Sequence, residues 1–134
     1  MKKITTLIFT ALLLSACGGG KEQLGLKEAL TAKLQDDPDL KDYKLNPADV
    51  ADCVVTGITG SLPGFPGDPR RKTYFEAYAK FVAVKTPTDA EKAVEEYKDL
   101  FGSVKQAREA AVSVTDHIMG CMGAALEQHG EEEE

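Results

Sequence analysis

The stretch at residues 103–125, SVKQAREAAVSVTDHIMGCMGAA, carries the most regular pattern in the chain. Apolar or small residues recur in it at alternating steps of three and four, which is typical of a helix packed against antiparallel neighbours. Ser103 and Gln106 form a capping box at its start, and Gly130 is expected to end it. Because small residues dominate the pattern, it predicts close helix packing. The inward-facing positions are Val104, Ala107, Ala111, Val114, Ile118, Cys121 and Ala125.

Two further helices are predicted in the first half of the chain. Residues 22–35 place three leucines one turn apart on one face, and the turn at residues 36–38 stops this helix. Asn46 can cap a second helix, and Pro47 suits its first position. Both stripes are expected to face the core, so Cys53 is expected to point inward. The stripes consist of Leu26, Leu30 and Leu34, and of Val50, Cys53, Val54, Gly57 and Ile58.

Residues 70–85 fit two patterns, a helical face and the alternation of a strand. We predict a helix, because alanine and charged residues are frequent here and the segment is long for a strand. The sequence TPTD at residues 86–89 then caps another helix that extends to Phe101. The helical face consists of Tyr74, Phe75, Tyr78, Phe81 and Val82, and the strand alternative of Phe75, Ala77, Ala79, Phe81 and Ala83.

These elements predict an all-α fold, a compact bundle of four or five helices pinned by one disulfide. The disulfide is expected between Cys53 and Cys121, and the loop of about 69 residues that it closes would stabilise the fold by about 4 kcal/mol. The alternative is a pair of free thiols, although neither cysteine lies in a C-x-x-C spacing. The helical domain is expected at residues 24–130, followed by an acidic tail at 131–134.

The first 17 residues have the pattern of an export signal. Lys2 and Lys3 supply a positive start, and residues 4–14 form an apolar run that is too short to span a bilayer. The motif Leu14-Ser15-Ala16-Cys17 then resembles the lipobox of bacterial lipoproteins. This resemblance implies cleavage of a signal peptide at residues 1–16 and acyl chains, such as palmitate, on Cys17. Two or three such chains anchor a soluble domain stably, and residues 17–23 are then a short Gly-rich tether.

The residue after the lipobox cysteine indicates a cellular compartment, and the net charge restricts the possible partners. Gly18, rather than an aspartate, follows the cysteine, and in Gram-negative lipoproteins this resemblance implies the outer membrane, facing the periplasm. Loss of residues 1–16 from the 134 residues of the chain leaves 118, and changes the formal charge from −6 to −8 because Lys2 and Lys3 are removed. The length fits one domain. The charge argues against nucleic acid as a partner and against adsorption of the chain to anionic headgroups.

Motifs for several chemistries are missing from the sequence. There is no glycine-rich phosphate loop, no G-x-S-x-G elbow and no C-x-x-C-H haem site. His117, Met119, Cys121 and Met122 could suit copper, but a disulfide-bonded Cys121 is not a thiolate ligand. His129 is expected to be solvated. Acidic residues at 91–99 alternate with lysines, which is typical of a solvated helix face and not of a catalytic site. From these observations together we predict no metal, no cofactor and no enzymatic activity.

The irregular segment at residues 60–69 is the candidate interaction surface, with three prolines and three glycines. It contains Leu62 and Phe65, and Arg70, Arg71 and Lys72 follow at a helix start, where positive charge is unfavourable beside the helix dipole. A partner protein or headgroup that contacts these five residues would compensate for that charge. In the alternative, Phe65 folds back onto the bundle and the basic side chains pair with acids.

Three classes of function remain. The leading one is a lipid-anchored, non-catalytic interaction or structural module of the cell envelope, with an envelope protein as its partner. The second is a carrier or sensor of a small apolar ligand in a pocket under Tyr74, Tyr78 and Phe81, although these aromatic residues also suit the core. The third is a redox or metal-binding protein that uses Cys53 and Cys121 as free or readily reduced thiols.

Overall fold

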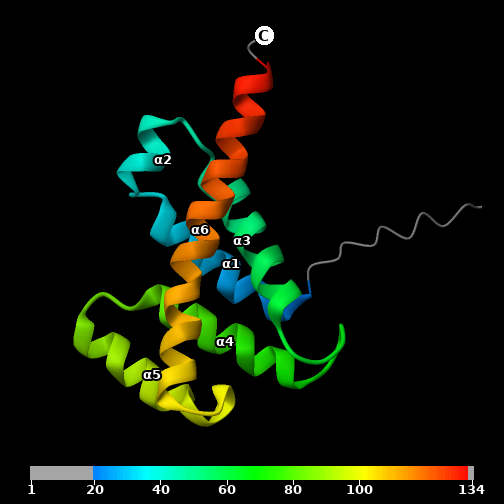
Figure 1. Cartoon of the computed structure of the whole chain (residues 1–134), viewed down its shortest axis with the longest axis vertical. Coiled ribbons are helices and arrows are strands. Elements are labelled where there is room, and N and C mark those ends of the chain that lie inside the picture. Colours follow the sequence, from blue (N-terminus) through cyan, green and yellow to red (C-terminus); the bar gives the residue numbers. More distant parts are fainter. Residues whose placement is uncertain (1–19, 133–134) are drawn as a thin grey trace, which may run out of the picture.

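The computed structural model describes residues 20–132, and the export signal, the lipobox and residues 133–134 lie outside this part. The described residues form helices and no strand, so the predicted all-α fold is confirmed (Figure 1). The ambiguous segment is helical from Arg70 to Ala83, as predicted. The six helices are α1 (Lys21–Leu34), α2 (Pro38–Asp42), α3 (Pro47–Ser61), α4 (Arg70–Ala83), α5 (Pro87–Phe101) and α6 (Val104–Glu132).

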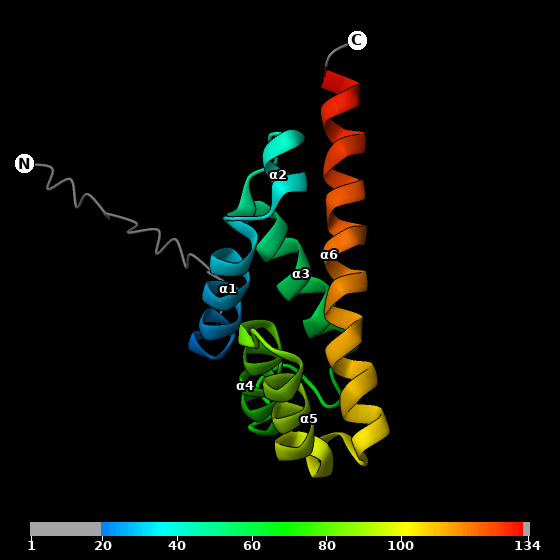
Figure 2. The same cartoon turned by 90° about the vertical axis from the view of Figure 1, so that its left-hand side faces the viewer.

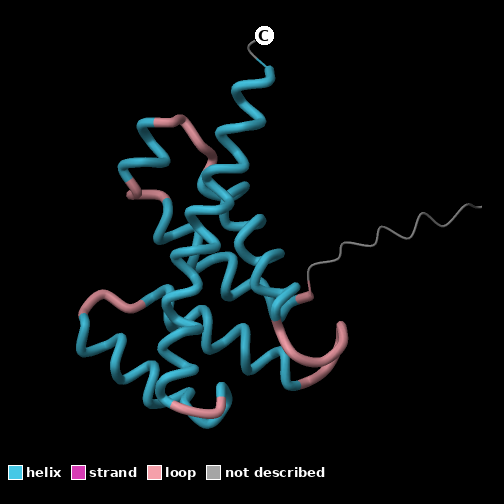
Figure 3. The backbone as a smooth tube through the Cα atoms, viewed as in Figure 1, coloured by secondary structure: helices cyan, strands magenta, loops and turns pink. Residues whose placement is uncertain are grey.

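Helix α6 organises the fold. It has 29 residues, which corresponds to about 43 Å at the rise of an α-helix. Figure 2 shows it running along one side of the molecule, packed against α5 in its first half and against α3 further on. Helix α1 packs against α3 and α4 on the other side. The last turns of α6 extend past the other helices, and short loops connect most of the elements (Figure 3).

Side-chain caps start the helices where the sequence predicts them. Asn46 accepts a hydrogen bond from the backbone N–H of Ala48 (2.9 Å), and Ser103 and Thr86 accept from the third residue that follows each of them. Asp37 caps the short α2, which the prediction of a simple stop at residues 36–38 missed. The prediction that Gly130 ends the last helix is wrong. Helix α6 continues to Glu132, because one glycine in a helix costs only about 1 kcal/mol.

The core consists of the predicted apolar stripes. Leu26 and Leu30 of α1 have no exposed surface, and they lie between α3 and α4 with Val54 and Ile58 of α3. Helix α6 contributes mainly Ala107, Val114 and Ile118. Burial of these side chains supplies most of the stability of a bundle of this size, at roughly 25 cal/mol for each Å² of apolar surface removed from water. The prediction of inward faces on α1 and α6 is therefore confirmed.

Helices α3 and α6 approach closely at Gly57. A Cβ atom built there would lie 2.8 Å from Nδ1 of His117, which is shorter than a normal van der Waals contact. His117 thus covers the backbone of α3, and a side chain at position 57 would displace it. The site needs glycine because of this contact and not because of its backbone angles.

We expect Gly57→Ala to lower the free energy of unfolding by about 1 kcal/mol. Overpacking costs roughly 1–3 kcal/mol, and the better helix propensity of alanine offsets about 1 kcal/mol of it. In a His117→Ala background the imidazole is gone, so the same substitution should stabilise the protein. Urea unfolding of the four proteins measures this coupling. An equal loss in both backgrounds would show that His117 does not set the requirement for glycine.

Candidate functional site

A groove of about 310 Å³ lies between the first turn of α3 and the last turns of α6. Leu45 and Val50, both buried, form its floor together with the Cys53–Cys121 disulfide, and Ala124 and Ala125 of α6 form one wall. Apolar atoms therefore lie at the bottom of the groove. Polar side chains surround the opening, namely those of Lys44, Asn46, Asp49, Gln128 and His129.

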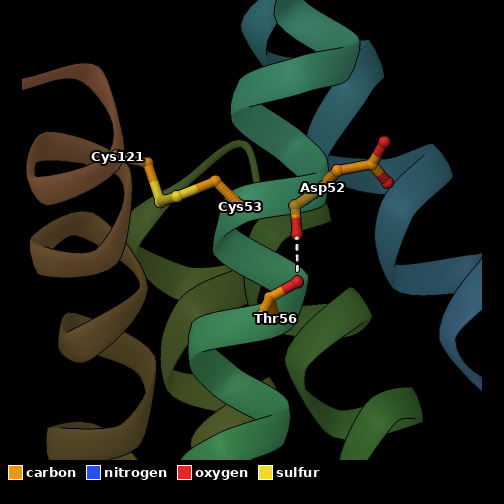
Figure 4. Close-up of a disulfide and its surroundings, with 4 residues drawn as sticks. All are labelled: Asp52, Cys53, Thr56 and Cys121. Atoms are coloured by element: carbon orange, nitrogen blue, oxygen red, sulfur yellow. Dashed lines mark hydrogen bonds between the residues drawn. A yellow bond between two sulfur atoms is a disulfide. The ribbon is translucent and has the colours of Figure 1, made fainter. Parts of the chain in front are cut away.

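The disulfide joins α3 to α6, as predicted (Figure 4). The Cα atoms of Cys53 and Cys121 are 5.9 Å apart. The prediction that Cys53 faces the core is wrong, because Cys53 is exposed while Cys121 lies at the margin of the core. The core face of α3 runs through Val50, Val54 and Ile58, so Cys53 lies on the flank toward α6. The alanines of α6 cover little of that flank, which leaves the disulfide accessible from the groove.

A tight corner before α3 sets the position of the groove's opening. The backbone N–H of Leu45 donates to the carbonyl oxygen of Leu40 (2.9 Å), which ties the start of α3 back to α2. Lys44 adopts a left-handed backbone conformation (φ 56°) to make this turn. The corner places Lys44, Asn46 and Asp49 on the surface. The polar opening of the groove is therefore fixed by backbone hydrogen bonds.

The end of the molecule that carries the groove is acidic. Exposed or half-buried carboxylates are frequent in residues 36–49, and Glu127 adds one near the end of α6, but among them only Asp49 lines the groove, together with Lys44. Lys41 lies 3.7 Å from the carboxylate of Asp36. Such a surface attracts positively charged partners and repels anions. The acidic residues are Asp36, Asp37, Asp39, Asp42, Asp49 and Glu127.

Within residues 20–132, no three His, Cys, Asp or Glu side chains are placed to hold a metal ion, and none of the described helices has the length and apolar character needed to cross a membrane. Met119 is 66 % exposed on the outer side of α6, as expected, and His129 is exposed at the groove.

Comparisons with family models, curated proteins and solved structures find no match. The geometry of the chain itself is therefore the basis for its interpretation.

The loop between α3 and α4 divides the predicted interaction residues into two groups. Phe65 (66 % exposed), Arg70 and Lys72 reach the surface. The alternative is thus wrong for Phe65, which does not fold back onto the bundle, but it is confirmed for Arg70 and Lys72, which pair with acidic side chains. Leu62 and Arg71 are buried, so the prediction that they contact a partner is corrected.

Arg71 is buried because it holds the loop together. Its guanidinium donates to the backbone oxygens of Leu62 (3.2 Å), Pro63 (3.4 Å) and Gly64 (3.1 Å) at the carboxyl end of α3. Positive charge is favourable at that end of a helix dipole. The positive charge of Arg71, which would be unfavourable at the start of α4, therefore lies at the carboxyl end of α3.

Asp68 compensates for the remaining charge at the start of α4. Its carboxylate accepts from the backbone N–H of Arg70 (2.9 Å) and from the Arg70 guanidinium (2.7 Å). These hydrogen bonds, first from the side chain and then from the backbone of Arg70, lower the pKa of Asp68 from 3.8 to about 2. Asp68 thus pairs with both the backbone N–H and the side chain of the first residue of α4.

The low pKa of Asp68 predicts a defined loss of stability in acid. Because its pKa is lower in the folded than in the unfolded protein, its stabilising effect is complete above about pH 4 and disappears as the pH falls through about 2. We expect Asp68→Asn to melt at a lower temperature than the wild type at neutral pH, with a difference that shrinks between about pH 4 and pH 2. Asp116→Asn, at an exposed position of α6, is the control. A difference independent of pH would contradict this assignment.

Tyr74, Tyr78 and Phe81 pack against one another and against α5. The rings of Tyr74 and Tyr78 contact Phe101 edge to face, with centroids 5.3 Å and 5.8 Å away, and the Tyr74 hydroxyl donates to the backbone oxygen of Leu100. Burial raises the pKa of the Tyr78 hydroxyl. The rings of Tyr74 and Tyr78 are occupied by contacts with α5, whereas Phe81 also lines a cleft of about 450 Å³ with residues of α5 and α6. The three residues therefore do not form the predicted pocket together.

Proposed function

We propose that this protein is a lipid-anchored module of the cell envelope that binds another envelope protein, without catalysis, through the groove between α3 and α6. The position of the groove supports the proposal. It lies at the start of α3, whereas the start of α1, which follows Cys17 in the chain, packs against the end of α3. Figure 1 shows the two ends apart. An anchor at Cys17 would leave the groove facing away from the membrane.

The partner is a positively charged segment of an envelope protein. Asp49 in the groove and the carboxylates of residues 36–42 that precede it in the chain favour basic side chains, and the apolar floor at Leu45, Val50 and the disulfide suits an aliphatic or aromatic side chain. The disulfide holds the two walls of the groove together, so the site is preformed and binding orders few additional groups.

The anchor is tested by the intact mass of the protein purified from its native membrane. We expect a diacylglyceryl or triacylglyceryl increment on Cys17 and its absence from a Cys17→Ser variant, which should also leave the membrane fraction. A chain without a lipid in the native membrane would refute the anchor.

The groove is tested by photo-crosslinking in living cells, with benzoylphenylalanine at position 124 in the groove or at position 119 on the outer side of α6. We expect an adduct from position 124 and none from position 119. Reversing the charge of the groove's acidic lining residue, in Asp49→Lys, should remove the adduct if a basic segment binds. Equal adducts from both positions would refute the groove as the binding site.

A second function, thiol–disulfide exchange, is favoured by the exposure of Cys53. The thiolate of a partner dithiol would attack the sulfur of Cys53, form a mixed disulfide and release Cys121 as a thiolate. Alkylation of native membranes before reduction separates the two functions. Labelled Cys53 and Cys121 would favour redox chemistry, and thiols that react only after reduction would favour a structural disulfide.

A further inference from the structure

The start of α1 lies beside the last turn of α3, from which the loop to α4 continues. The side-chain amide of Gln23, in the first turn of α1, lies 3.5 Å from the hydroxyl oxygen of Thr59, in the last turn of α3. Gly20 and Leu24 line a shallow groove with residues of the second half of α3. The chain that leads back to Cys17 therefore starts at the end of the bundle that carries residues 62–69.

The distance between an anchor and this end is short. Gly20 is three positions after Cys17 in the chain, and an extended chain covers about 3.5 Å per residue. A lipid on Cys17, which is part of the proposed function, would hold Gly20 within about 10 Å of the membrane surface. The loop at residues 62–69 would then face the bilayer.

An ordered turn presents Phe65 at that end. The backbone N–H of Asp68 donates to the backbone oxygen of Phe65 (3.0 Å), and Gly67 has a φ of 92°. With Pro66 before Gly67, residues 65–68 have the pattern of a type II turn. Arg71 fixes the residues before the turn through their backbone oxygens. Phe65 is thus exposed on a rigid support, as an aromatic residue that enters a membrane interface should be.

Basic side chains outnumber acidic ones in the segment around Phe65, because residues 62–72 contain Arg70, Arg71 and Lys72 against Asp68. The side chains of Arg70 and Lys72 are 74 % and 64 % exposed, and Lys21 is exposed at the start of α1. Asp68 and Glu76 pair with the first two. The net negative charge of the chain argues against adsorption of the whole molecule, but the segment at residues 62–72 has a formal charge of +2. The end next to the tether is the one suited to anionic headgroups.

We propose that this end of the bundle rests on an anionic membrane, with Phe65 at the boundary between headgroups and acyl chains and with Lys21, Arg70 and Lys72 at the phosphates. The lipid on Cys17 and the loop would act as two contacts, which fixes the orientation of the domain and directs the α3–α6 groove away from the surface. The contact at the loop is additional to the anchor and separable from it.

Tryptophan fluorescence tests the contact, because the chain contains no tryptophan. Phe65→Trp introduces a single emitter at the loop, and Tyr43→Trp introduces one at the opposite end, where Tyr43 is 57 % exposed. The full lipidated proteins are reconstituted into vesicles of phosphatidylethanolamine and phosphatidylglycerol with brominated acyl chains. We expect emission from position 65 to shift to the blue and to fall at least about twofold, and emission from position 43 to stay unchanged.

The outcomes separate this inference from the proposed anchor. Lipidated, vesicle-bound protein in which positions 65 and 43 are equally unquenched would overturn the contact and leave the anchor intact. If the measured mass shows no lipid, the unlipidated protein is mixed with the same vesicles. Quenching at position 65 would then support the membrane contact without the anchor. No quenching at position 65 would overturn the membrane contact. In lipidated Phe65→Trp protein, Lys72→Gln should reduce the quenching. An unchanged signal in that variant and in vesicles without phosphatidylglycerol would overturn the role of charge.

Discussion

Replacement of both Cys53 and Cys121 by alanine should lower the free energy of unfolding by about 4 kcal/mol. The two residues are separated by 68 positions, so the disulfide removes much of the conformational freedom of the unfolded chain. For a domain of this size the melting temperature should fall by about 15 °C or more. Circular dichroism at 222 nm during thermal and urea unfolding measures both quantities.

Reduction of the wild type provides the control for this prediction. Reduced wild type and the double variant should unfold together, because both lack the same cross-link and Cys53 is accessible to reductant. A double variant as stable as the oxidised protein would mean that the disulfide forms because α3 and α6 are close but does not stabilise the fold. It would also weaken the proposal of a preformed groove.

Arg71→Met should have the second largest effect, a loss of about 2–3 kcal/mol. Methionine retains most of the aliphatic volume but donates no hydrogen bond, so the backbone oxygens of Leu62 and Gly64 lose their charged donor. The positive charge at the carboxyl end of α3 disappears as well. Urea unfolding measures the loss of stability, and amide hydrogen exchange of residues 62–69 should become faster.

Two variants show whether the position of the charge matters. Arg71→Lys should recover only part of the stability, because one ammonium group does not reach three carbonyl oxygens as a planar guanidinium does. Lys72→Met, at the next and exposed position, should change the stability by less than about 0.5 kcal/mol. Similar losses for Arg71→Met and Lys72→Met would refute the role assigned to Arg71.

Local signals explain what the sequence predicted well. The caps at Asn46, Thr86 and Ser103 each depend on a side chain and a backbone N–H within three residues. The stripes on α1 and α6 depend on helical spacing alone, and the number of cysteines after the lipobox predicts the disulfide. These features need no knowledge of how the helices pack.

Other features depend on contacts between distant segments or on competing signals. Asp37 and Pro38 indicate both the end of one helix and the start of another, so α2 was missed. The burial of Arg71 follows from backbone oxygens seven to nine residues away, which no periodicity encodes. The groove exists because α6 extends past the start of α3, and the small residues at 123–125 after Cys121 were the signal that could have indicated it.

The connection between α3 and α4 also determines what happens when the chain is cut. Residues 62–69 lie between the two cysteines, and residues 63–67 are exposed, so a protease can reach the chain there. A nick there divides the polypeptide into an amino-terminal piece with α1 to α3 and a carboxyl-terminal piece with α4 to α6. The Cys53–Cys121 bond still joins the two pieces, so a cleaved molecule keeps both walls of the groove until a reductant separates them.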